Sequence, residues 1–487
     1  MSETSEQHEL RQQKLAVLKE RGQDPFETTR YDRTHCADEI RANFDRLDGS
    51  TVRIAGRLLE VRDHGKVRFA DLVDGSGSVQ LYARKNDLGD EAFAAFTDMD
   101  RGDIVGVTGR AFRTRAGEVT VAVEQFQLLA KALRPLPKRW HGLRDVELRS
   151  RQRYADLLAN PESRELFVKR SEAISAVRRL MDDRGYIEVE TPMMHPIPGG
   201  ALARPFVTHH NTLDMALYMR IAPELYLKRL IVGGLEKVYE IGRVFRNEGI
   251  SPRHNPEYTL LESYEAYADY EDMMTLVEAI INCMAEVVCG GPKFVFRGEE
   301  IDVTPPWPRV QFMEAITDRT GVDMSQATDD ESARELAAGL EIDLEQRPTL
   351  PQILDGLFDR YIVHEIMQPT FVVDYPTIIS PLAKRKPGAP RLAERFEPII
   401  GRMEMGNAFS ELNDPDDQRE RFLEQARMHA AGDEEAHRMD EDYIRALEYG
   451  MPPTGGIGLG MDRLLMLMTD AENLREVILF PLLRPVD

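Results

Sequence analysis

The sequence predicts an α+β protein of several domains, in which a small β-barrel precedes a larger domain of mixed strands and helices. From residue 51 to residue 130, short segments of alternating apolar residues are separated by turn signals, which is typical of a barrel. Beyond residue 160, strands and helices follow one another without the regular alternation of a parallel sheet. A chain of 487 residues has room for about two to four domains.

Residues 1–50 are expected to form an N-terminal helical extension. Three leucines recur among charged residues between positions 5 and 21, and Asp24-Pro25 ends that helical segment. The extension lacks the apolar core of a secretory signal, and the chain has no run of about 18 apolar residues that would span a membrane. The three cysteines form no CxxC pair, so a reducing cytoplasm is the expected location.

Residues 51–133 are predicted to form a barrel of the OB type. A helix-like stretch, DEAFAAFTDM, follows the third of five strand-like segments. These segments are TVRIAGRLLEV, KVRFADLVD, GSVQLYA, DIVGVTGRAF and EVTVAVEQFQLL. This is the order of an OB-fold, which commonly binds oligonucleotides. Another kind of small β-barrel is the alternative.

The excess of acidic residues is unevenly distributed. The chain has 62 Lys and Arg against 84 Asp and Glu, and a formal charge of −22 by itself argues against a nucleic-acid partner. The first 153 residues nevertheless carry +2, and the rest carry −24. A basic stretch follows the barrel, and it is either a solvated linker, assigned to residues 134–160, or a surface that faces RNA. Its cations are Lys131, Arg134, Lys138, Arg139, Arg144, Arg149, Arg151 and Arg153.

Residues 161–487 are expected to form one large domain. Asn160-Pro161 starts a helix that ends near Gly185. Residues from about 290 to 360 contain no motif with an evident chemical role, and we interpret them as an insertion in this domain.

The segment GRVFRNEGISPRHNPEY, residues 242–258, gathers cations around the acid Glu248. Apolar, strand-like stretches lead into it and out of it, and Gly249 with Ser251-Pro252 supplies the turn of a hairpin. Such a hairpin aims several cations into one space, and guanidinium groups bind phosphate oxygens in pairs. The segment therefore predicts an oligophosphate site, with an ordinary charged surface loop as the alternative.

The segment PPTGGIGLGMDRLLMLMTD, residues 452–470, places a glycine-rich run before a helix that begins at Met461 or Asp462. Glycines let a ligand approach the backbone closely, and a helix N-terminus attracts anions, to which Arg463 adds a full charge. The run is not a dinucleotide fingerprint, because Met461 stands where GxGxxG requires its third glycine.

The segment RFEPIIGRMEMGNAFSELND, residues 395–414, contains Glu397, Glu404 and Glu411 at intervals of seven. Its alternating apolar residues indicate strands. Carboxylates that face phosphates usually hold Mg²⁺, which prefers oxygen ligands. Solvent-facing acids on an edge strand are the alternative.

Together these segments resemble the signature of the class II aminoacyl-tRNA synthetases. TPMMHPIPGGA at 191–201 resembles the first family motif, which lies at a dimer interface. FRNEG at 245–249 with HNPEY at 254–258 resembles the second motif, and GIGLGMDR at 456–463 resembles the third. The OB-fold indicates the subgroup for lysine, aspartate or asparagine. Within that subgroup the chain resembles the bacterial-type lysyl-tRNA synthetases over nearly its whole length, in segments such as YMRIAPELYLKRL and GNAFSELND.

The resemblance implies a class II catalytic domain built on an antiparallel sheet flanked by helices, in a homodimer. It implies that L-lysine and ATP give lysyl-adenylate and pyrophosphate, and that the lysyl group then passes to the 3′ end of tRNA(Lys) with release of AMP. Positioning and electrostatic stabilisation supply the catalysis, so no protein nucleophile is required. Mg²⁺, as more than one ion, is the implied cofactor, ATP is a substrate, and no membrane is involved.

The resemblance also implies site residues. Arg246 and Arg463 are the catalytic residues. The ATP site consists of Arg246, Glu248, His254, Tyr258 and Arg463, and the Mg²⁺ ligands are Glu397 and Glu404. The lysine site consists of Gly200, Glu224, Glu262, Tyr264, Asn407, Phe409 and Glu411. The anticodon contacts are Arg62, Phe69 and Gln80, with a place in the barrel core as the alternative for Phe69.

Three other functions compete with this interpretation. One is a related protein that binds but has lost catalysis, and retention of Arg246, Arg463, Glu397 and Glu404 speaks against it. A second is a ligase that attaches lysine to a protein; relatives of that kind resemble only the catalytic part, so the first 150 residues speak against it. A third is synthesis of dinucleoside polyphosphates, as a side activity of the same site.

Overall fold

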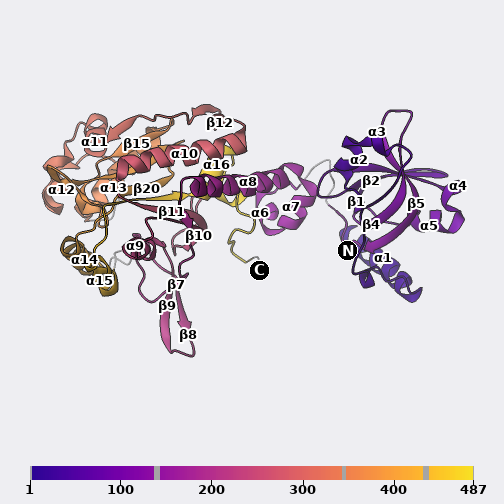
Figure 1. The fold of residues 1–487 in the computed structure, drawn as a ribbon, viewed down its shortest axis with the longest axis horizontal. Coiled ribbons are helices and arrows are strands. Elements are labelled where there is room, and N and C mark those ends of the chain that lie inside the picture. Colours follow the sequence, from indigo (N-terminus) through magenta and orange to yellow (C-terminus); the bar gives the residue numbers. More distant parts are fainter. Residues whose placement is uncertain (1–2, 137–142, 343–346, 431–437, 486–487) are drawn as a thin grey trace. The chain divides into compact units, whose positions relative to one another are not determined.

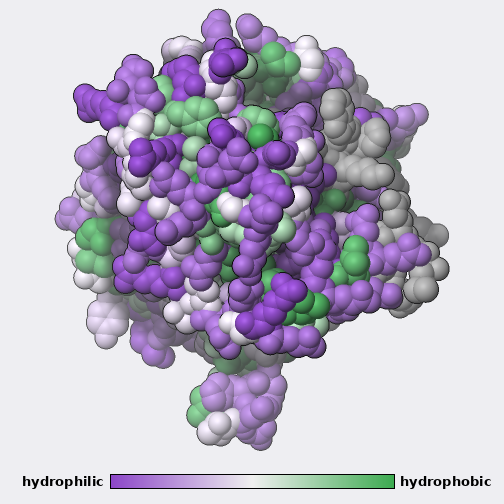
Figure 2. All heavy atoms as spheres, turned by 90° about the vertical axis from the view of Figure 1, so that its right-hand side faces the viewer, coloured by the Kyte–Doolittle hydropathy of each residue, from purple (hydrophilic) through white to green (hydrophobic). Residues whose placement is uncertain are grey.

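The chain divides into two compact units, Met1–Arg144 and Asp145–Asp487, in a computed structural model (Figure 1). The structure describes residues 3–136, 143–342, 347–430 and 438–485. Hydrophilic residues predominate on the face shown in Figure 2, and apolar residues lie scattered among them. Among the described residues, no helix is both long and apolar enough to cross a membrane.

Unit 1 is a closed barrel preceded by helices. Its helices are α1 Glu3–Glu20, α2 Ala37–Ala42, α3 Phe44–Leu47, α4 Lys85–Leu88 and α5 Asp90–Thr97. Its strands are β1 Thr51–His64, β2 Val67–Val73, β3 Ser78–Arg84, β4 Ile104–Arg113 and β5 Val119–Ala130. They pair in the order β1-β2-β3-β5-β4, and the pairs are antiparallel except for β3 with β5. The predicted OB arrangement, with helix after the third strand, is confirmed.

The barrel closes around the apolar residues of alternate strand positions. In β2 and β3 every second residue is buried, and Leu72 and Leu81 are fully withdrawn from water. Phe96 of α5 belongs to the same core, so this helix packs against the barrel interior. The alternation follows from the two-residue repeat of a strand, which is the pattern that predicted these elements.

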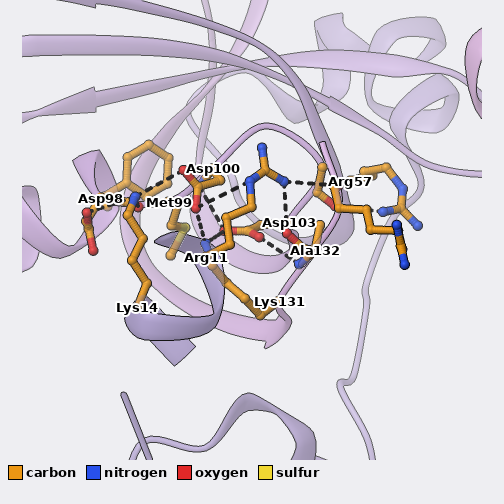
Figure 3. A network of polar contacts seen from close by, with 12 residues as sticks. Arg11, Lys14, Arg57, Asp98, Met99, Asp100, Asp103, Lys131 and Ala132 are labelled. Carbon is orange, nitrogen blue, oxygen red and sulfur yellow. Dashed lines mark hydrogen bonds and ion pairs between the residues drawn. The ribbon is translucent and has the colours of Figure 1, made fainter. Parts of the chain in front are cut away.

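A buried cluster of charges ties α1 and the chain after β5 to the barrel (Figure 3). Asp103 is fully buried and accepts hydrogen bonds from Lys131 Nζ at 2.7 Å and from the Ala132 amide at 2.9 Å. Lys131 Nζ also lies 2.5 Å from Asp100 Oδ2, and Arg11 of α1 donates to the Ala132 carbonyl at 2.8 Å. Because buried charges are tolerated only when they are paired, this cluster fixes the end of the last barrel strand.

Part of the basic stretch that was predicted as a linker is helical structure of unit 2. Helices α6 Val146–Arg151 and α7 Arg153–Ala159 follow one another there. Arg153 is buried, with its guanidinium 2.6 Å from Asp156, and Arg149 pairs with the same carboxylate at 2.9 Å. Arg149 and Arg153 thus serve the packing of unit 2, and an RNA-facing role of the basic stretch stays a prediction. Lys138 and Arg139 lie outside the described residues.

Unit 2 is built on a large sheet. Its strands are β6 Ile187–Glu188, β10 Lys237–Phe245, β11 Glu257–Ala266, β14 Arg309–Gln311, β15 Thr370–Val373, β18 Arg395–Ile400, β19 Met403–Glu404, β20 Gly406–Ser410 and β21 Thr454–Gly460. They pair in the order β14-β15-β18-β20-β21-β11-β10-β6, with β19 beside β18. The central strands are antiparallel as predicted, whereas the edge strands β14 and β6 pair in parallel with their neighbours.

Helices flank this sheet. They are α8 Pro161–Asp183, α9 Glu224–Val232, α10 Tyr270–Cys289, α14 Pro415–Ala430, α15 Glu441–Glu448 and α16 Met461–Met468. Helices α8 and α10 run side by side (Figure 1), and their buried residues join those of α16 and the sheet in the main core. After α8 the chain turns at Gly185, whose φ of +81° is readily adopted only by glycine. A small sheet projects from the unit: β7 Met194–His195, β9 Met215–Met219 and β8 Val207–His210.

Residues 290–360, interpreted as an insertion, form a hairpin, one strand of the large sheet and three helices. The hairpin and the helices are β12 Lys293–Phe296, β13 Glu299–Asp302, α11 Phe312–Thr320, α12 Asp330–Leu336 and α13 Leu350–Tyr361. The helices share a core in which Phe312 and Leu357 are fully buried. Strand β14 of this segment joins the large sheet, so the segment is not wholly separate from the domain. Residues 343–346 lie outside the described residues. After this segment, the short strands β16 Arg385–Lys386 and β17 Ala389–Ala393 form a separate hairpin.

The buried cluster of Figure 3 gives a stability prediction. Asp103→Asn removes the charge that receives Lys131, so we expect the barrel to lose roughly 1.5–3 kcal/mol, the range for hydrogen bonds to charged groups. Hydrogen exchange of the β4 and β5 amides in the full chain reports this loss. Glu124→Gln, which breaks the exposed pair with Arg110, is the control and should cost under about 1 kcal/mol. Equal losses in the two variants would contradict the role given to Asp103.

Candidate active site

One cavity of unit 2 brings together every residue predicted for ATP, Mg²⁺ and lysine. It has a volume of about 330 Å³ and is lined from the turn between β10 and β11, from β11, β18 to β21 and α9, and from the start of α16. The predicted residues that line it are Gly200, Glu224, Arg246, Glu248, His254, Tyr258, Glu262, Tyr264, Glu397, Glu404, Asn407, Phe409, Glu411 and Arg463. Because they come from distant parts of the chain, the sheet and not the local sequence assembles this site.

Glycines of β21 leave the space that becomes the cavity. The cross-strand rows of the sheet are Glu262–Gly458–Asn407 and Tyr264–Gly456–Phe409. Residues two apart on a strand share a face, so the glycines stand between two walls of larger side chains. The glycine-rich run, expected as the approach to a helix, is thus a central strand, and α16 begins at Met461 directly after it.

The two glycines are not equivalent. A Cβ at Gly456 would collide with Glu411 Oε1 and with the Tyr264 ring. A Cβ at Gly458 would meet only ordinary contacts, the nearest 3.6 Å away on Glu262. Gly456 is therefore required by close packing, whereas Gly458 provides open room.

Three carboxylates are buried at one end of the cavity. Glu224, Glu262 and Glu411 are 5%, 4% and 1% exposed, and burial raises the pKa of each. The Tyr264 hydroxyl donates to Glu262 Oε2 at 3.1 Å. Lys228, which was not predicted, pairs with Glu224 at 2.6 Å and with Glu411. An end so rich in buried acid favours a ligand that brings positive charge.

Gly200 lines the acidic end of the cavity, where its backbone lies beside the Glu224 side chain. Its φ is +91°, in the left-handed region that favours glycine, and a Cβ there would lie 3.0 Å from the Glu224 side chain. Both the conformation and the space therefore require glycine at this position.

Cations and an aromatic ring gather in another part of the cavity. The predicted hairpin is confirmed, because β10 and β11 pair from Lys237 to Phe245, on either side of the cation-rich turn. The Arg246 guanidinium lies 5.5 Å from the Tyr258 ring centroid, and its buried Nε has no hydrogen-bond partner among the described residues. Burial, with Arg463 nearby, lowers the pKa of His254, so its ring is neutral at pH 7. An unused guanidinium donor beside a flat ring suits an anionic ligand with an aromatic part.

The start of α16 is held firmly. Asp462 accepts from Arg170 Nη1 at 2.5 Å and from the Thr259 amide at 2.8 Å, which joins the helix to α8 and β11. The next residue, Arg463, lines the cavity and donates to the Glu404 carbonyl at 2.8 Å. The guanidinium thus stands in the first turn of a fixed helix, where anions are favoured.

Glu397 and Glu404 fit a cation such as Mg²⁺. Burial and the nearby charge of Glu404 raise the pKa of Glu397 to about 7, although Arg395 Nη2 donates to it at 2.6 Å. A cation between the two carboxylates would relieve that repulsion, and their oxygens are the donors that Mg²⁺ prefers. Within the described ranges, no group of three or more His, Cys, Asp or Glu is placed so that it could hold a metal ion.

Two cations that pair with acids of the cavity were missed from the sequence, although a signal for each was present. Lys228 follows Glu224 by four residues in α9, a spacing that puts both on one helix face. Arg395 precedes Glu397 by two residues in β18, a spacing that puts both on one strand face.

The three residues predicted for the anticodon share one surface of the barrel in unit 1. Arg62 pairs in register with Phe69, and Phe69 with Tyr82, two residues from Gln80. Phe69 is half-buried and does not belong to the barrel core, which contradicts the alternative placement in the core. Its ring lies 5.2 Å from the Tyr82 ring, and Tyr82 lies 5.7 Å from Phe112. Tyr82 and Phe112 were not predicted and extend a strip of rings across the strands.

Comparisons with known proteins agree with both units. The family model described as tRNA synthetases class II (D, K and N) matches residues 145–484, and the one described as OB-fold nucleic acid binding domain matches residues 52–129. The lysine–tRNA ligase of Carboxydothermus hydrogenoformans is 54% identical over 485 residues, covering 100% of this chain and 99% of the relative. Those of Pelotomaculum thermopropionicum and Clostridium tetani are 55% and 50% identical, covering 98% and 100% of this chain and 94% and 98% of the relatives.

The glycines of β21, Gly456 and Gly458, give a prediction that can be tested without a ligand. Gly456→Ala forces a collision inside the cavity wall, so we expect the free energy of unfolding of unit 2 to fall by about 1–3 kcal/mol, as for overpacking. Gly458→Ala, on the same strand face, is the matched control and should change it by less than about 0.5 kcal/mol. Urea unfolding followed by circular dichroism measures both. Similar values for the two variants would show that the close contact at Gly456 is relieved by movement.

Proposed function

The chain belongs to the class II tRNA synthetases of the D, K and N group, and on this premise we propose that it is a lysine–tRNA ligase. It activates L-lysine with ATP to lysyl-adenylate, releases pyrophosphate, and transfers the lysyl group to the 3′ end of tRNA(Lys) with release of AMP. The observation that carries this proposal is the cavity in which buried acids and phosphate-binding cations meet. The OB-fold unit favours tRNA as the acceptor over a protein.

The acidic end of the cavity selects the amino acid. We propose that Glu262, Glu411 and Tyr264 receive the ε-ammonium of lysine, and that Glu224 with the Gly200 carbonyl receives the α-ammonium. Asn407 and Phe409 complete the pocket. Buried carboxylates stabilise a cation and repel an anion, so aspartate would be rejected where lysine is held.

The cationic part of the cavity binds ATP in this proposal. Arg246 holds the α-phosphate and the lysine carboxylate, and Tyr258 stacks on the adenine, as its ring beside the Arg246 guanidinium allows. Glu248 contacts the adenine side, His254 faces the outer phosphates, and Arg463 clamps the γ-phosphate and covers the other face of the base.

Catalysis follows from this placement. The carboxylate of lysine attacks the α-phosphorus, the bond to the bridging oxygen breaks, and pyrophosphate leaves. Arg246 and Arg463 stabilise the negative charge that builds up on the phosphate oxygens, and the hydrogen bond to the Glu404 carbonyl holds Arg463 in place before the reaction begins. Glu397 and Glu404 would hold Mg²⁺, as more than one ion, which supplies further neutralisation of phosphate charge.

Partners and location are proposed with the function. Apolar side chains that are about half exposed or more lie on and near the motif predicted for a dimer interface, which supports a homodimer. They are Met193, Met194, Val207 and Leu213. The barrel surface of Arg62, Phe69 and Gln80 contacts the anticodon. The cytoplasmic location stays a prediction, in keeping with cysteines that are free thiols.

The function is tested by ATP–pyrophosphate exchange of the purified chain with each of the twenty amino acids, followed by aminoacylation of total tRNA. Lysine should stimulate the exchange and should be found on tRNA(Lys), because its two ammonium groups match the acidic end. Exchange stimulated by aspartate or asparagine and not by lysine would overturn the specificity. Exchange without aminoacylation would leave lysine activation standing and refute the tRNA step.

The barrel surface gives a separate prediction. Phe69→Ala removes a stacking ring, worth about 1–3 kcal/mol for a base, so the KM for tRNA should rise by roughly tenfold or more. Lysine-dependent exchange should stay unchanged, because this residue lies in the other unit. Phe26→Ala, at an exposed ring outside the strip, is the control and should alter neither assay. A loss in both assays by Phe69→Ala would mean that the ring serves stability alone.

A further inference from the structure

Lys228 lies among the acids of the cavity. Its side chain is fully buried, and Nζ lies 2.6 Å from Glu224 Oε1 and in contact with Glu411 Oε2. The centroids of the Phe409 and Tyr264 rings lie 5.3 Å and 5.9 Å from Nζ. One ammonium thus bridges two carboxylates that the proposed function assigns to opposite ends of the substrate lysine.

The fold fixes the position of this ammonium. Lys228 follows Glu224 by one turn of α9, and the neighbouring Leu225, Leu227 and Ile231 are buried in an apolar core. A side chain on such a helix, withdrawn from water, has few alternative conformations. Burial lowers the pKa of Lys228, but Glu224 and Glu411 outweigh burial and raise it, so the cation is permanent at neutral pH.

The charges at this end then match one ligand. Glu224, Glu262 and Glu411 carry three negative charges when ionised, whereas lysine brings two ammonium groups. Burial raises the pKa of all three acids, so each holds its charge less readily when no cation is near. A protonated acid is a weaker partner for an ammonium. When the three acids are ionised, they and Lys228 together carry a net charge equal and opposite to that of the two ammonium groups.

We propose that Lys228 is a specificity-determining positioning residue, which keeps Glu224 and Glu411 ionised and oriented to receive the two ammonium groups of lysine. This inference rests on the proposed lysine activation. Glu411 supports it, because neither of its buried carboxylate oxygens has a hydrogen-bond partner among the described residues; Oε2 is in ion-pair contact with Lys228, and Oε1 lies over Gly456. Lys228 occupies one acceptor of Glu411 and leaves the other open to the ligand.

A different role would place Lys228 as a competitor that fills the ε-ammonium site until lysine displaces it. The two roles differ in sign. A resident counter-charge strengthens lysine binding, whereas a competitor weakens it. The KM for lysine of a variant without the charge therefore separates them.

The experiment compares Lys228→Met with the unaltered chain in ATP–pyrophosphate exchange. Met keeps the apolar stem and removes the ammonium, so the KM for lysine should rise by roughly tenfold to a hundredfold, as for the loss of a charged hydrogen bond. The KM for ATP should change by less than about twofold, because Lys228 is not among the residues that line the cavity and acts only through the acids it pairs with. Lys237→Met, at a partly exposed lysine paired with Glu265, is the matched control and should change neither KM.

A second comparison repeats the Lys228→Met substitution in a variant that lacks the Glu411 carboxylate. Glu411→Gln alone should raise the KM for lysine, and adding Lys228→Met to it should raise that KM by less than about tenfold, because Glu224 is then the only paired carboxylate left for the ammonium to balance. The double variant buries fewer unpaired charges, so this arm decides the matter even if the single variant does not fold. An unchanged or lower KM for lysine in Lys228→Met, or a further rise of about tenfold or more in the double variant, would overturn the inference. Failure of the unaltered chain to exchange with lysine would instead overturn the proposed function.

Discussion

Buried carboxylates within one cavity impose the constraint on which the rest of unit 2 depends. Glu224, Glu262 and Glu411 come from α9, β11 and the end of β20, so their approach requires the antiparallel sheet and the helix beside it to pack in one way. Like charges out of water repel, and each tends to take up a proton unless a cation is near. Lys228 supplies part of that positive charge from within the fold, and the substrate supplies the rest.

The charge distribution has a similar explanation. The acidic excess belongs to the residues that follow position 153, and part of it faces the cavity. The basic residues around the end of the barrel are less available than their number suggests. Lys131, Arg149 and Arg153 are paired with carboxylates of their own units, so their charges stabilise the fold and are not free to bind another molecule. Net charge is thus a poor guide to binding unless the pairing of each charge is known.

Much of the fold and of the site could be predicted because the signals are local. The two-residue repeat of the barrel strands, Pro161 at a helix start and the hairpin around Glu248 are patterns of neighbouring residues. The rest required the three-dimensional structure. Helices α6 and α7 could not be predicted from their basic sequence, because the ion pairs of Arg149 and Arg153 with Asp156 that stabilise them are seen only in the structure. Lys228 was overlooked because only the packing of α9 shows that its ammonium is buried.

The glycines of β21 also restrict how this site can change through evolution. Gly456 and Gly458 have no side chains, so any substitution at either position reduces the volume of the cavity and none enlarges it. A lineage that drifted toward a bulkier amino acid would have to remodel the facing walls on β11 and β20, where the acids and the aromatic rings stand. Those walls also set the charge, so size and charge preference are inherited together. The pocket is consequently easier to lose than to retune.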